Sequence, residues 1–177
     1  MDVLRVNDLD FRQFLSDQDI QNRIKQIAAQ INQDLKNESP LFLGILNGSF
    51  MFAADLMKEV SIKSEITFVK LSSYSGLQST GDVRTRIGLE TPVKGRVVVI
   101  VEDIIDTGKT VFELLEILKK EKPERIIVAT LLLKPDALQY DLEIDYIGFK
   151  VPNNFLVGYG LDYDGLGRNL RDIYMKI

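Results

Sequence analysis

The residues of this chain best suited to chemistry lie at positions 102–110, which read Glu-Asp-Ile-Ile-Asp-Thr-Gly-Lys-Thr. A helix that opens at the Gly-Lys-Thr end would present unpaired N–H groups and the positive end of its dipole, which suit a phosphate. The carboxylates of Glu102, Asp103 and Asp106 would repel a bare phosphate. A phosphorylated sugar fits both features, because its phosphate takes the N–H groups while its hydroxyls, often with a metal ion, take the carboxylates.

Two other interpretations of this segment explain less. The loop of P-loop nucleotide-binding proteins needs a glycine five positions before the glycine of 108–110, where this chain has Asp103. Acids inside that loop would repel a triphosphate, so we do not favour this interpretation. A plain strand–turn–helix with Asp106 or Thr107 as the helix cap explains one acid. It does not explain three neighbouring acids, which repel each other when unliganded.

The segment needs a strand before it and a helix after it. Val97–Val101 is an unbroken apolar run, typical of a buried parallel strand, and apolar residues at helical spacing follow at 111–118. Ser16 is a suitable cap for a helix with an apolar stripe from Ile20 to Leu35. A further helix is predicted after Asn47-Gly48-Ser49. The other predicted strands are Leu41–Leu46, Ile66–Leu71, Ile126–Leu133, Tyr146–Val151 and Phe155–Tyr159.

Alternation of strands and helices predicts an α/β fold with a central parallel sheet. Residues 72–82 are polar and contain glycine, so we expect a loop there, followed by an alternating ribbon at 83–89. Ligands of such sheets bind beyond the carboxyl ends of the strands. The polar residues expected at that edge are Asn47, Glu102, Asp103, Asp106 and Lys134.

Composition sets the broad class. The chain has 177 residues, of which 45% are hydrophobic, enough for a single domain spanning 1–177 with a substantial core. A net charge of −4 argues against electrostatic binding to nucleic acid or to an anionic membrane surface. We find no run of transmembrane length and no signal-peptide pattern.

Two residue types are absent. Without cysteine the chain has no disulfide or thiol chemistry, and a cytoplasmic location is the natural expectation. Without histidine, proton transfer falls to Asp, Glu, Lys or Tyr, and a metal site would be built from oxygen ligands, which suits Mg²⁺ best.

The sequence Val-Glu-Asp-Ile-Ile-Asp-Thr-Gly-Lys-Thr at 101–110 resembles the phosphoribosyl-pyrophosphate (PRPP) signature of type I phosphoribosyltransferases. It is similar in particular to that of the hypoxanthine–guanine phosphoribosyltransferase family. Four further segments resemble that family in the same order, and the matches run from about residue 41 to 172. They are 46–49 (the pyrophosphate loop), 73–74 with 78–82 (the lid), 131–135 (the purine-reading lysine), and 155–162 with Arg168 (the base-stacking and metal-binding end).

The resemblance implies a type I phosphoribosyltransferase fold with a central, mainly parallel sheet flanked by helices. It also implies a mobile lid loop and a small hood, which we expect the C-terminal strands to build. The implied reaction is transfer of phosphoribosyl from PRPP to hypoxanthine or guanine, with xanthine left open. The products would be IMP or GMP and pyrophosphate, with Mg²⁺ as cofactor. The alternatives are a regulator that binds PRPP or nucleotides, and a transferase for adenine, orotate or uracil.

The resemblance also assigns roles. Asp106 would be the catalytic base, and Ser73 and Tyr74 would belong to the lid. The residues assigned to PRPP and its phosphates are Asn47, Gly48, Glu102, Asp103, Asp106, Thr107, Gly108, Lys109, Thr110 and Arg168. Those assigned to the purine are Lys134, Phe155, Leu156 and Asp162. Those assigned to metal are Glu102, Asp103 and Asp162.

Some features depart from the family pattern or carry no assignment. Many relatives have a basic residue where this chain has Asn47, whose amide can bind pyrophosphate but adds no charge. Family members often hold the peptide bond before this position cis. By composition alone Phe155 is a core residue.

Residues 1–40 show no residues with an evident chemical role. Self-association into a homodimer or homotetramer is expected from the resemblance.

Overall fold

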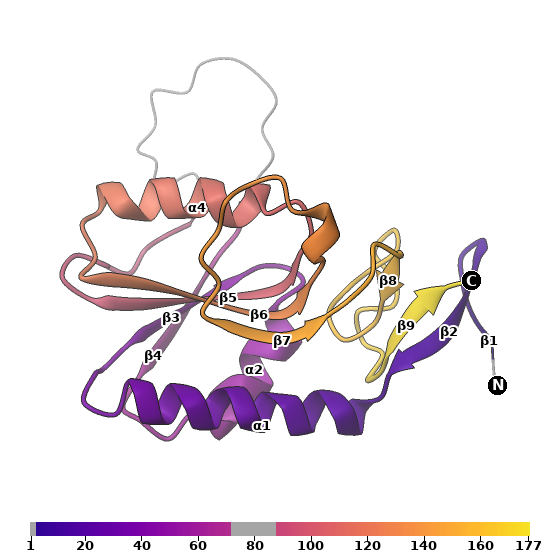
Figure 1. Ribbon diagram of the computed structural model, residues 1–177, viewed down its shortest axis with the longest axis horizontal. Coiled ribbons are helices and arrows are strands. Elements are labelled where there is room, and N and C mark those ends of the chain that lie inside the picture. The colour runs from indigo at the N-terminus through magenta and orange to yellow at the C-terminus, as the bar shows by residue number, and fades with distance from the viewer. Residues whose placement is uncertain (1–2, 72–87) are drawn as a thin grey trace, which may run out of the picture.

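The computed structural model describes residues 3–71 and 88–177 (Figure 1). Its main sheet has five parallel strands in the order β4-β3-β5-β6-β7. The strands are β3 (Leu41–Ile45), β4 (Glu65–Val69), β5 (Val97–Ile105), β6 (Arg125–Leu133) and β7 (Tyr146–Lys150). The α/β class and the mainly parallel central sheet predicted from the sequence are confirmed. The predicted lid residues and the segment 83–87 of the predicted ribbon lie outside the described residues.

Helices cover both faces of this sheet (Figure 1). They are α1 (Asp17–Asp34), α2 (Phe50–Glu59) and α4 (Lys109–Lys120), with a 3₁₀ turn, η1 (Pro135–Ala137). Helix α1 starts where predicted, because the Ser16 side chain accepts a hydrogen bond from the Asp19 N–H. The isoleucine stripe of α1 packs with α2 in one hydrophobic cluster, and α4 packs in a second cluster with residues of β3, β5 and β6.

Strand β5 is longer than its apolar start suggests. It continues through Glu102 and Asp103 to Ile105, because Ile104 and Ile105 still pair with Leu132 and Leu133 of β6. On its other side, pairing with β3 ends at Val101. The two acids therefore lie on a strand that has a partner on one side only.

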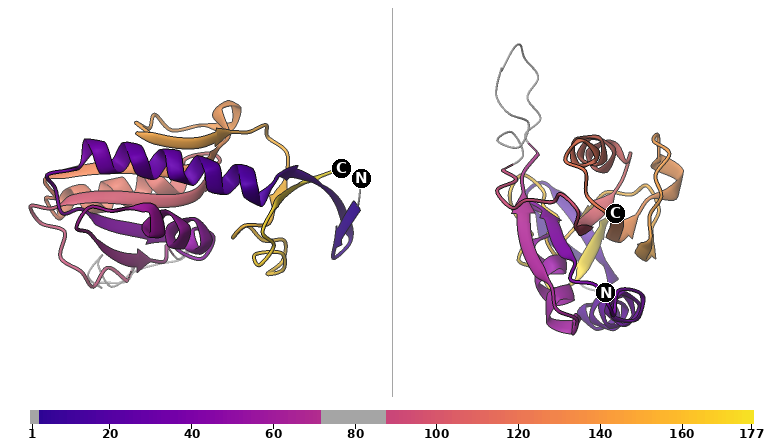
Figure 2. Two further views of the ribbon diagram at one scale, coloured as in Figure 1. Left: turned by 90° about the horizontal axis from the view of Figure 1, so that it is seen from below. Right: turned by 90° about the vertical axis from the view of Figure 1, so that its left-hand side faces the viewer.

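The hood is a second sheet, four-stranded and antiparallel, in the order β1-β2-β9-β8. Its strands are β1 (Val3–Val6), β2 (Leu9–Leu15), β8 (Leu156–Val157) and β9 (Ile173–Lys176). The expectation of a hood made from the C-terminal strands was wrong in part. The N-terminal hairpin supplies half of it, and the predicted strand at 146–151 joins the main sheet as β7. The two termini consequently lie together at the hood end of the molecule (Figures 1 and 2).

Strand β8 is shorter than the predicted run 155–159. Gly158, Tyr159 and Gly160 all have positive φ, of 106°, 49° and 98°, and such angles end an extended strand. The other predicted strands differ from the structure only at their ends. No helix in the described ranges combines the length and apolar character required to cross a membrane.

Candidate active site

The polar residues predicted for the carboxyl edge of the sheet come together there. Strands β3, β5 and β6 run parallel and side by side, so the 46–49 loop, the acids of β5 and Lys134 all lie at the carboxyl edge of the sheet. The hood lies beside this edge. The arrangement follows from parallel pairing, which brings like ends of neighbouring strands together.

Glu102 and Asp103 form a buried acidic pair, only 5% and 9% exposed. The Glu102 carboxylate accepts a hydrogen bond from the Asp103 N–H at 3.1 Å. Burial raises the pKa of Glu102 well above its usual range. The side chain of Asp103 acts in the same direction through hydrogen bonding and charge, whereas the Asp103 N–H acts in the opposite direction. The pair is therefore a site that a cation would stabilise.

The 46–49 loop packs directly on this pair. The Leu46–Asn47 peptide bond is cis. Gly48 lies so close to Asp103 that a Cβ at position 48 would overlap the Asp103 carboxylate. On its other side the Gly48 carbonyl lies against Gly160 of the turn that follows β8, where a Cβ would also overlap. The loop is thus held between β5 and the hood.

Helix α4 begins without a side-chain cap of the predicted kind. Its cap residue is Gly108, which has φ +85° and no side chain to donate or accept, so neither Asp106 nor Thr107 serves as the cap. Thr107 Oγ1 instead accepts from the Lys109 N–H at 3.3 Å. The Lys109 side chain points along the helix surface toward Glu113, 3.7 Å away. Any phosphate contact of Lys109 would therefore be made by its backbone.

Asp106 and Lys134 form an ion pair, with Lys134 Nζ 2.7 Å from Asp106 Oδ2. Lys134 is 8% exposed, whereas the Asp106 side chain is half exposed. Lys134 is therefore not a solvated residue at the end of a strand, because the Asp106 carboxylate holds its ammonium group at this edge of the sheet.

The hood presents Phe155 beside this edge. Phe155 is 42% exposed, so the assignment to the core from composition was wrong. Its ring packs edge-on against Tyr163, with ring centroids 5.6 Å apart, and lies 6.2 Å from Phe11. Phe11 and Tyr163 hold the Phe155 ring in place and leave part of it free for a ligand.

Leu156 begins β8, the edge strand of the hood sheet. The Lys176 N–H donates to the Phe155 carbonyl, so the backbone groups of Phe155 face β9. Because peptide groups alternate in direction along a strand, the N–H and C=O of Leu156 face the open edge. The side chain of Leu156 is buried.

Asp162 and Arg168 are paired with each other. Asp162 Oδ1 lies 2.6 Å from Arg168 Nη2, and Asp162 Oδ2 accepts from the Gly165 N–H at 2.7 Å. Arg168 also donates to the Gly160 carbonyl at 2.6 Å. Within residues 3–71 and 88–177, no three acidic side chains converge closely enough to hold a metal ion alone.

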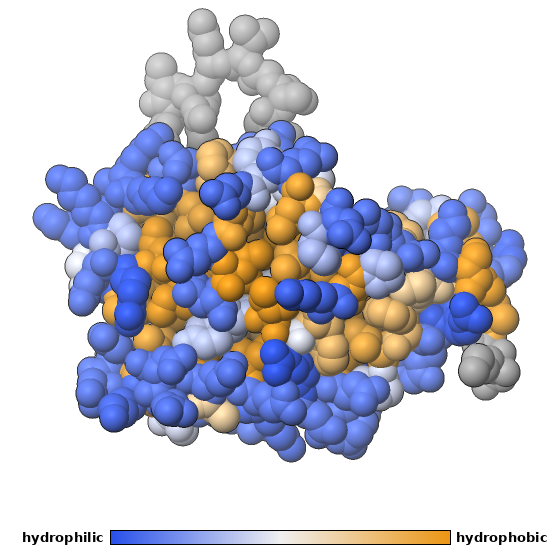
Figure 3. Space-filling view, in the orientation of Figure 1, coloured by the Kyte–Doolittle hydropathy of each residue, from blue (hydrophilic) through white to orange (hydrophobic). Residues whose placement is uncertain are grey.

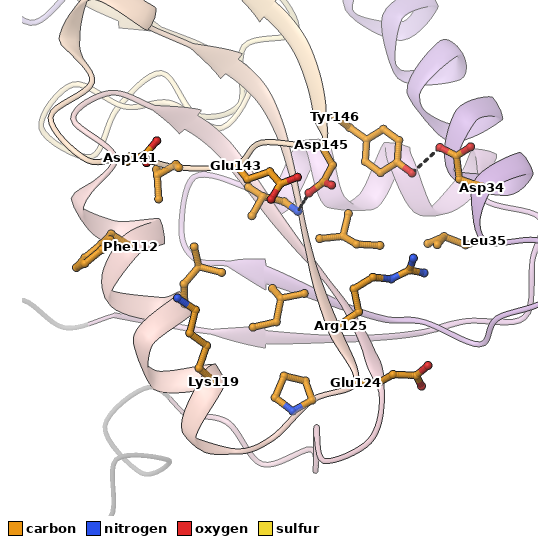
Figure 4. A pocket seen from close by; sticks show the side chains of 16 residues that line it. Asp34, Leu35, Phe112, Lys119, Glu124, Arg125, Asp141, Glu143, Asp145 and Tyr146 are labelled. Atoms are coloured by element: carbon orange, nitrogen blue, oxygen red, sulfur yellow. Dashed lines mark hydrogen bonds between the residues drawn. The ribbon is translucent and has the colours of Figure 1, made fainter.

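A groove of about 790 Å³ lies elsewhere, at the opposite end of β6, and contains none of the predicted site residues (Figure 4). It runs between α4, the start of β6 and the chain before β7. Apolar surface gathers on this side of the molecule, between α4 and α1 (Figure 3). In the groove the Tyr146 hydroxyl donates to Asp34 at 2.9 Å.

Comparison with known proteins decides the family. The model of the phosphoribosyl transferase domain matches residues 12–164. The chain belongs to the phosphoribosyltransferase family. Hypoxanthine-guanine phosphoribosyltransferase from Staphylococcus epidermidis is 43% identical over 157 residues, which are 88% of either chain. The Bacillus subtilis protein of the same name is 40% identical over 157 residues, 88% of this chain and 87% of that one.

Solved phosphoribosyltransferase structures share the fold. A crystal structure of a hypoxanthine phosphoribosyltransferase from Staphylococcus aureus superposes with a TM-score of 0.86 at 40% identity, covering 97% of this chain and 93% of that one. A hypoxanthine-guanine phosphoribosyltransferase from Bacillus anthracis gives a TM-score of 0.86 at 34% identity, covering 96% and 100%. The type I phosphoribosyltransferase fold expected from the sequence motifs is confirmed.

Sequence reasoning placed 155–162 in the candidate site but predicted a strand as far as Tyr159, so it missed the turn at Gly158-Tyr159-Gly160. The available signal was the pair of glycines around a tyrosine directly after an apolar run, because flanking glycines indicate a sharp turn. It also missed the N-terminal hairpin. There, two β-rich runs flank Asn7-Asp8, and Asn7 takes φ +53° at the turn.

Proposed function

We propose that this protein transfers the 5-phosphoribosyl group from PRPP to a 6-oxopurine, hypoxanthine or guanine, and releases pyrophosphate. The products are IMP or GMP, so the reaction salvages free purine bases. The observation that carries the proposal is the contact between Asp106 and Lys134 at the edge of the sheet, 2.7 Å apart.

That contact matches one edge of a 6-oxopurine. The 6-oxo group and N7 of such a purine lie side by side and point the same way. Lys134 donates to the 6-oxo group, which an adenine amino group cannot replace as an acceptor. Asp106 takes or shares the N7 proton while N9 attacks the sugar, since the chain has no histidine for that task. A purine would thus exchange the Lys134–Asp106 contact for contacts with its own two atoms.

The hood completes the purine site in this proposal. Phe155 stacks on the base through the exposed part of its ring, and the Leu156 backbone groups, which face the open edge of β8, bind the base edge. Phe155 and Leu156 lie at the start of the hood strand β8, whereas Asp106 and Lys134 directly follow β5 and β6 of the main sheet. The two sheets therefore form one functional unit, and we propose that 1–177 is a single domain.

PRPP would lie across the strand ends. The N–H groups of residues 106–110 and the Thr107 and Thr110 hydroxyls bind the 5′-phosphate. The carboxylates of Glu102 and Asp103 accept from the ribose hydroxyls. Asn47, Gly48 and Arg168 hold the pyrophosphate. The lid roles of Ser73 and Tyr74 stay predictions from the family resemblance.

The acidic pair fits Mg²⁺. Glu102 and Asp103 are buried side by side, and none of the ion pairs in the described ranges involves either of them. Mg²⁺ is often bound by one or two carboxylates and completes its shell with water and phosphate oxygens, so three protein acids are not needed. When bound, it would neutralise charge on the leaving pyrophosphate. Asp162 would serve a second ion after releasing Arg168.

We further propose that the protein acts in the cytoplasm and self-associates, as a dimer or tetramer. The edge strand β4 exposes Ile66 and Phe68, which lie two residues apart and so on the same face of the sheet. Among the described residues no strand pairs with the outer side of β4, and apolar side chains on such an edge favour contact with another copy. Light scattering after size-exclusion chromatography would reveal the state, and a monomer at micromolar concentration would contradict the proposal.

The reaction is tested by incubating the protein with PRPP, Mg²⁺ and one free base at a time, and by separating the nucleotides by chromatography. We expect IMP from hypoxanthine, GMP from guanine and little product from adenine, orotate or uracil. A parallel gel-shift assay with DNA and RNA tests for a regulator. Nucleic-acid binding without any nucleotide formation would replace the proposed transferase with a PRPP-binding regulator.

A further inference from the structure

Tyr159 occupies an unusual position next to the site. It is 1% exposed and has φ +49°, a backbone conformation that residues other than glycine rarely adopt. Its neighbours Gly158 and Gly160 also have positive φ. A bulky residue persists in this conformation only when surrounding contacts hold it there. The contacts of the Tyr159 side chain therefore hold the turn in this conformation.

The Tyr159 hydroxyl reaches Asp55 of helix α2. It donates to Asp55 Oδ2 at 2.6 Å, and the same carboxylate accepts from Gln21 at 2.8 Å and from Lys58 at 2.7 Å. Although partial burial opposes it, these hydrogen bonds lower the pKa of Asp55 below its usual value. Asp55 is thus an ionised acceptor shared by α1, α2 and the hood, and hydrogen bonds to charged groups are among the stronger ones.

The other side of the turn contacts the loop and the arginine that the proposed function assigns to pyrophosphate. Gly160 packs on the Gly48 carbonyl. The Gly160 N–H donates to the Arg168 carbonyl at 3.0 Å, and Arg168 Nη1 donates to the Gly160 carbonyl at 2.6 Å. A shift of the turn would therefore move Gly48 and Arg168 relative to each other.

Helix α2 links Tyr159 to the 46–49 loop. It begins at Phe50, two residues after Gly48, and carries Asp55 in its second turn. The hood turn therefore contacts the 46–49 loop in two ways. Gly160 touches Gly48 directly, and Tyr159 fixes the same turn to the helix that continues from the loop.

We propose that Tyr159 is a positioning residue, whose hydroxyl bond to Asp55 sets the spacing between the 46–49 loop and Arg168 and thereby the affinity for the pyrophosphate group of PRPP. The inference rests on the proposed function. Tyr159 does not touch the reacting atoms, so its removal should weaken PRPP binding more than it slows the chemical step.

The test compares Tyr159→Phe with a matched control, Tyr146→Phe. Tyr146 is also buried and also donates to an aspartate on a helix, Asp34, but it lies in the groove at the opposite edge (Figure 4). Each substitution removes one hydroxyl bonded to a carboxylate. We expect Tyr159→Phe to raise the KM for PRPP roughly 3- to 10-fold, because part of one charged hydrogen bond is transmitted to the site. Tyr146→Phe should leave that KM unchanged.

Further readouts separate positioning from general damage. The kcat at saturating PRPP and the KM for hypoxanthine should change by less than about 2-fold in Tyr159→Phe. Thermal unfolding midpoints should fall by similar amounts in both variants. Inorganic pyrophosphate, tested as a product inhibitor, should inhibit Tyr159→Phe less strongly than wild type. A cavity of about 360 Å³ beside Asp55 lets water replace the lost hydroxyl, so we expect the variant to fold.

Substitutions of Asp55 supply a second line. Asp55→Asn keeps an acceptor oxygen for Tyr159 and should retain most of the PRPP affinity, whereas Asp55→Ala should match Tyr159→Phe. The double variant Tyr159→Phe with Asp55→Ala should be no worse than Asp55→Ala alone, since both remove one interaction.

Equal PRPP KM values for wild type, Tyr159→Phe and Asp55→Ala would overturn the inference, as would a loss confined to kcat. If neither Tyr159→Phe nor Asp55→Ala folds, the test rests on Asp55→Asn. A PRPP KM of Asp55→Asn close to that of wild type supports the inference. A PRPP KM of Asp55→Asn raised roughly 3- to 10-fold, as predicted for Asp55→Ala, overturns it. Failure of the proposed function looks different, because wild type itself would then form no nucleotide from PRPP and hypoxanthine.

Discussion

At the scale of single residues, the site is organised by two carboxylate contacts of opposite kinds. Glu102 and Asp103 are neighbouring buried acids, and no ion pair within residues 3–71 and 88–177 involves either of them, which prepares them for hydroxyls and a cation. Asp106 already has a cation, the ammonium of Lys134. The ribose hydroxyls and a metal ion would reduce the repulsion between Glu102 and Asp103. The purine would replace the contact between Asp106 and Lys134 with contacts to its own atoms.

Lys134→Ala should impair use of the base far more than use of PRPP. It removes the donor to the 6-oxo group and leaves Asp106 unpaired, so we expect the KM for hypoxanthine to rise roughly 10- to 100-fold, in line with loss of a charged hydrogen bond. Steady-state kinetics with each substrate varied in turn would measure this. Lys119→Ala, an exposed lysine of α4 bound to Glu116, is the control. Similar losses for both substrates would argue against a base-reading role.

Asp106→Asn should lower kcat by roughly 10²- to 10⁴-fold, the usual contribution of a general base. PRPP binding should survive, because the backbone groups of residues 106–110 remain. Turnover and PRPP affinity, the latter from calorimetry, would be compared with those of Glu124→Gln, an exposed acid just before β6, at the end of that strand away from Lys134. An unchanged kcat would remove Asp106 from the mechanism.

At the scale of elements, close backbone contacts set the geometry. Gly48 lies between Asp103 of β5 and Gly160 of the hood turn, with no room for a methyl group on either glycine. These contacts join segments that are far apart in the chain, so no local pattern of residue types could reveal them. The role of 46–49 as a pyrophosphate loop stays a prediction from the family resemblance.

Gly48→Ala should destabilise the fold by about 1–3 kcal/mol, the range for overpacking, and should weaken PRPP binding. The added Cβ would overlap the Asp103 carboxylate. Combining it with Asp103→Ala opens that space, so Gly48→Ala should cost less stability in the Asp103→Ala background than in wild type. Chemical denaturation of the four proteins measures this cycle. Equal costs in both backgrounds would contradict the packing argument.

The strands of the main sheet could be predicted because they are apolar runs. The helices that cover it could be predicted because their apolar residues recur at helical spacing. The hood could not be predicted fully, because it pairs residues 11–15 of the N-terminal hairpin with 173–176 near the other end of the sequence. The exposure of Phe155 could not be read from its residue type, because a phenylalanine is usually buried. Its place next to the edge strand of the hood leaves it 42% exposed, and its purine-stacking role stays a prediction from the family resemblance.

At the scale of the whole molecule, the two sheets divide the proposed work. The main sheet carries the groups for phosphate, sugar and the 6-oxo edge, and the hood carries the stacking ring. The N-terminal hairpin, which showed no chemistry in the sequence, supports that ring through Phe11, a fully buried residue.

Phe11→Ala should therefore affect both stability and purine binding. Removing a fully buried phenylalanine typically costs about 3–5 kcal/mol, and the Phe155 ring would lose a neighbour. Phe14→Ala on the same strand removes a more exposed ring and is the control. Thermal unfolding and the KM for hypoxanthine are the measurements. If the two variants behave alike, the hairpin does not support the purine site.

A crystal structure of the protein with IMP bound would test the proposed site directly. We expect the phosphate at the N–H groups of residues 106–110, the ribose hydroxyls at Glu102 and Asp103, and the 6-oxo group within hydrogen-bond distance of Lys134 Nζ. IMP bound elsewhere, such as in the groove beside Tyr146, with the Lys134–Asp106 contact intact, would contradict it.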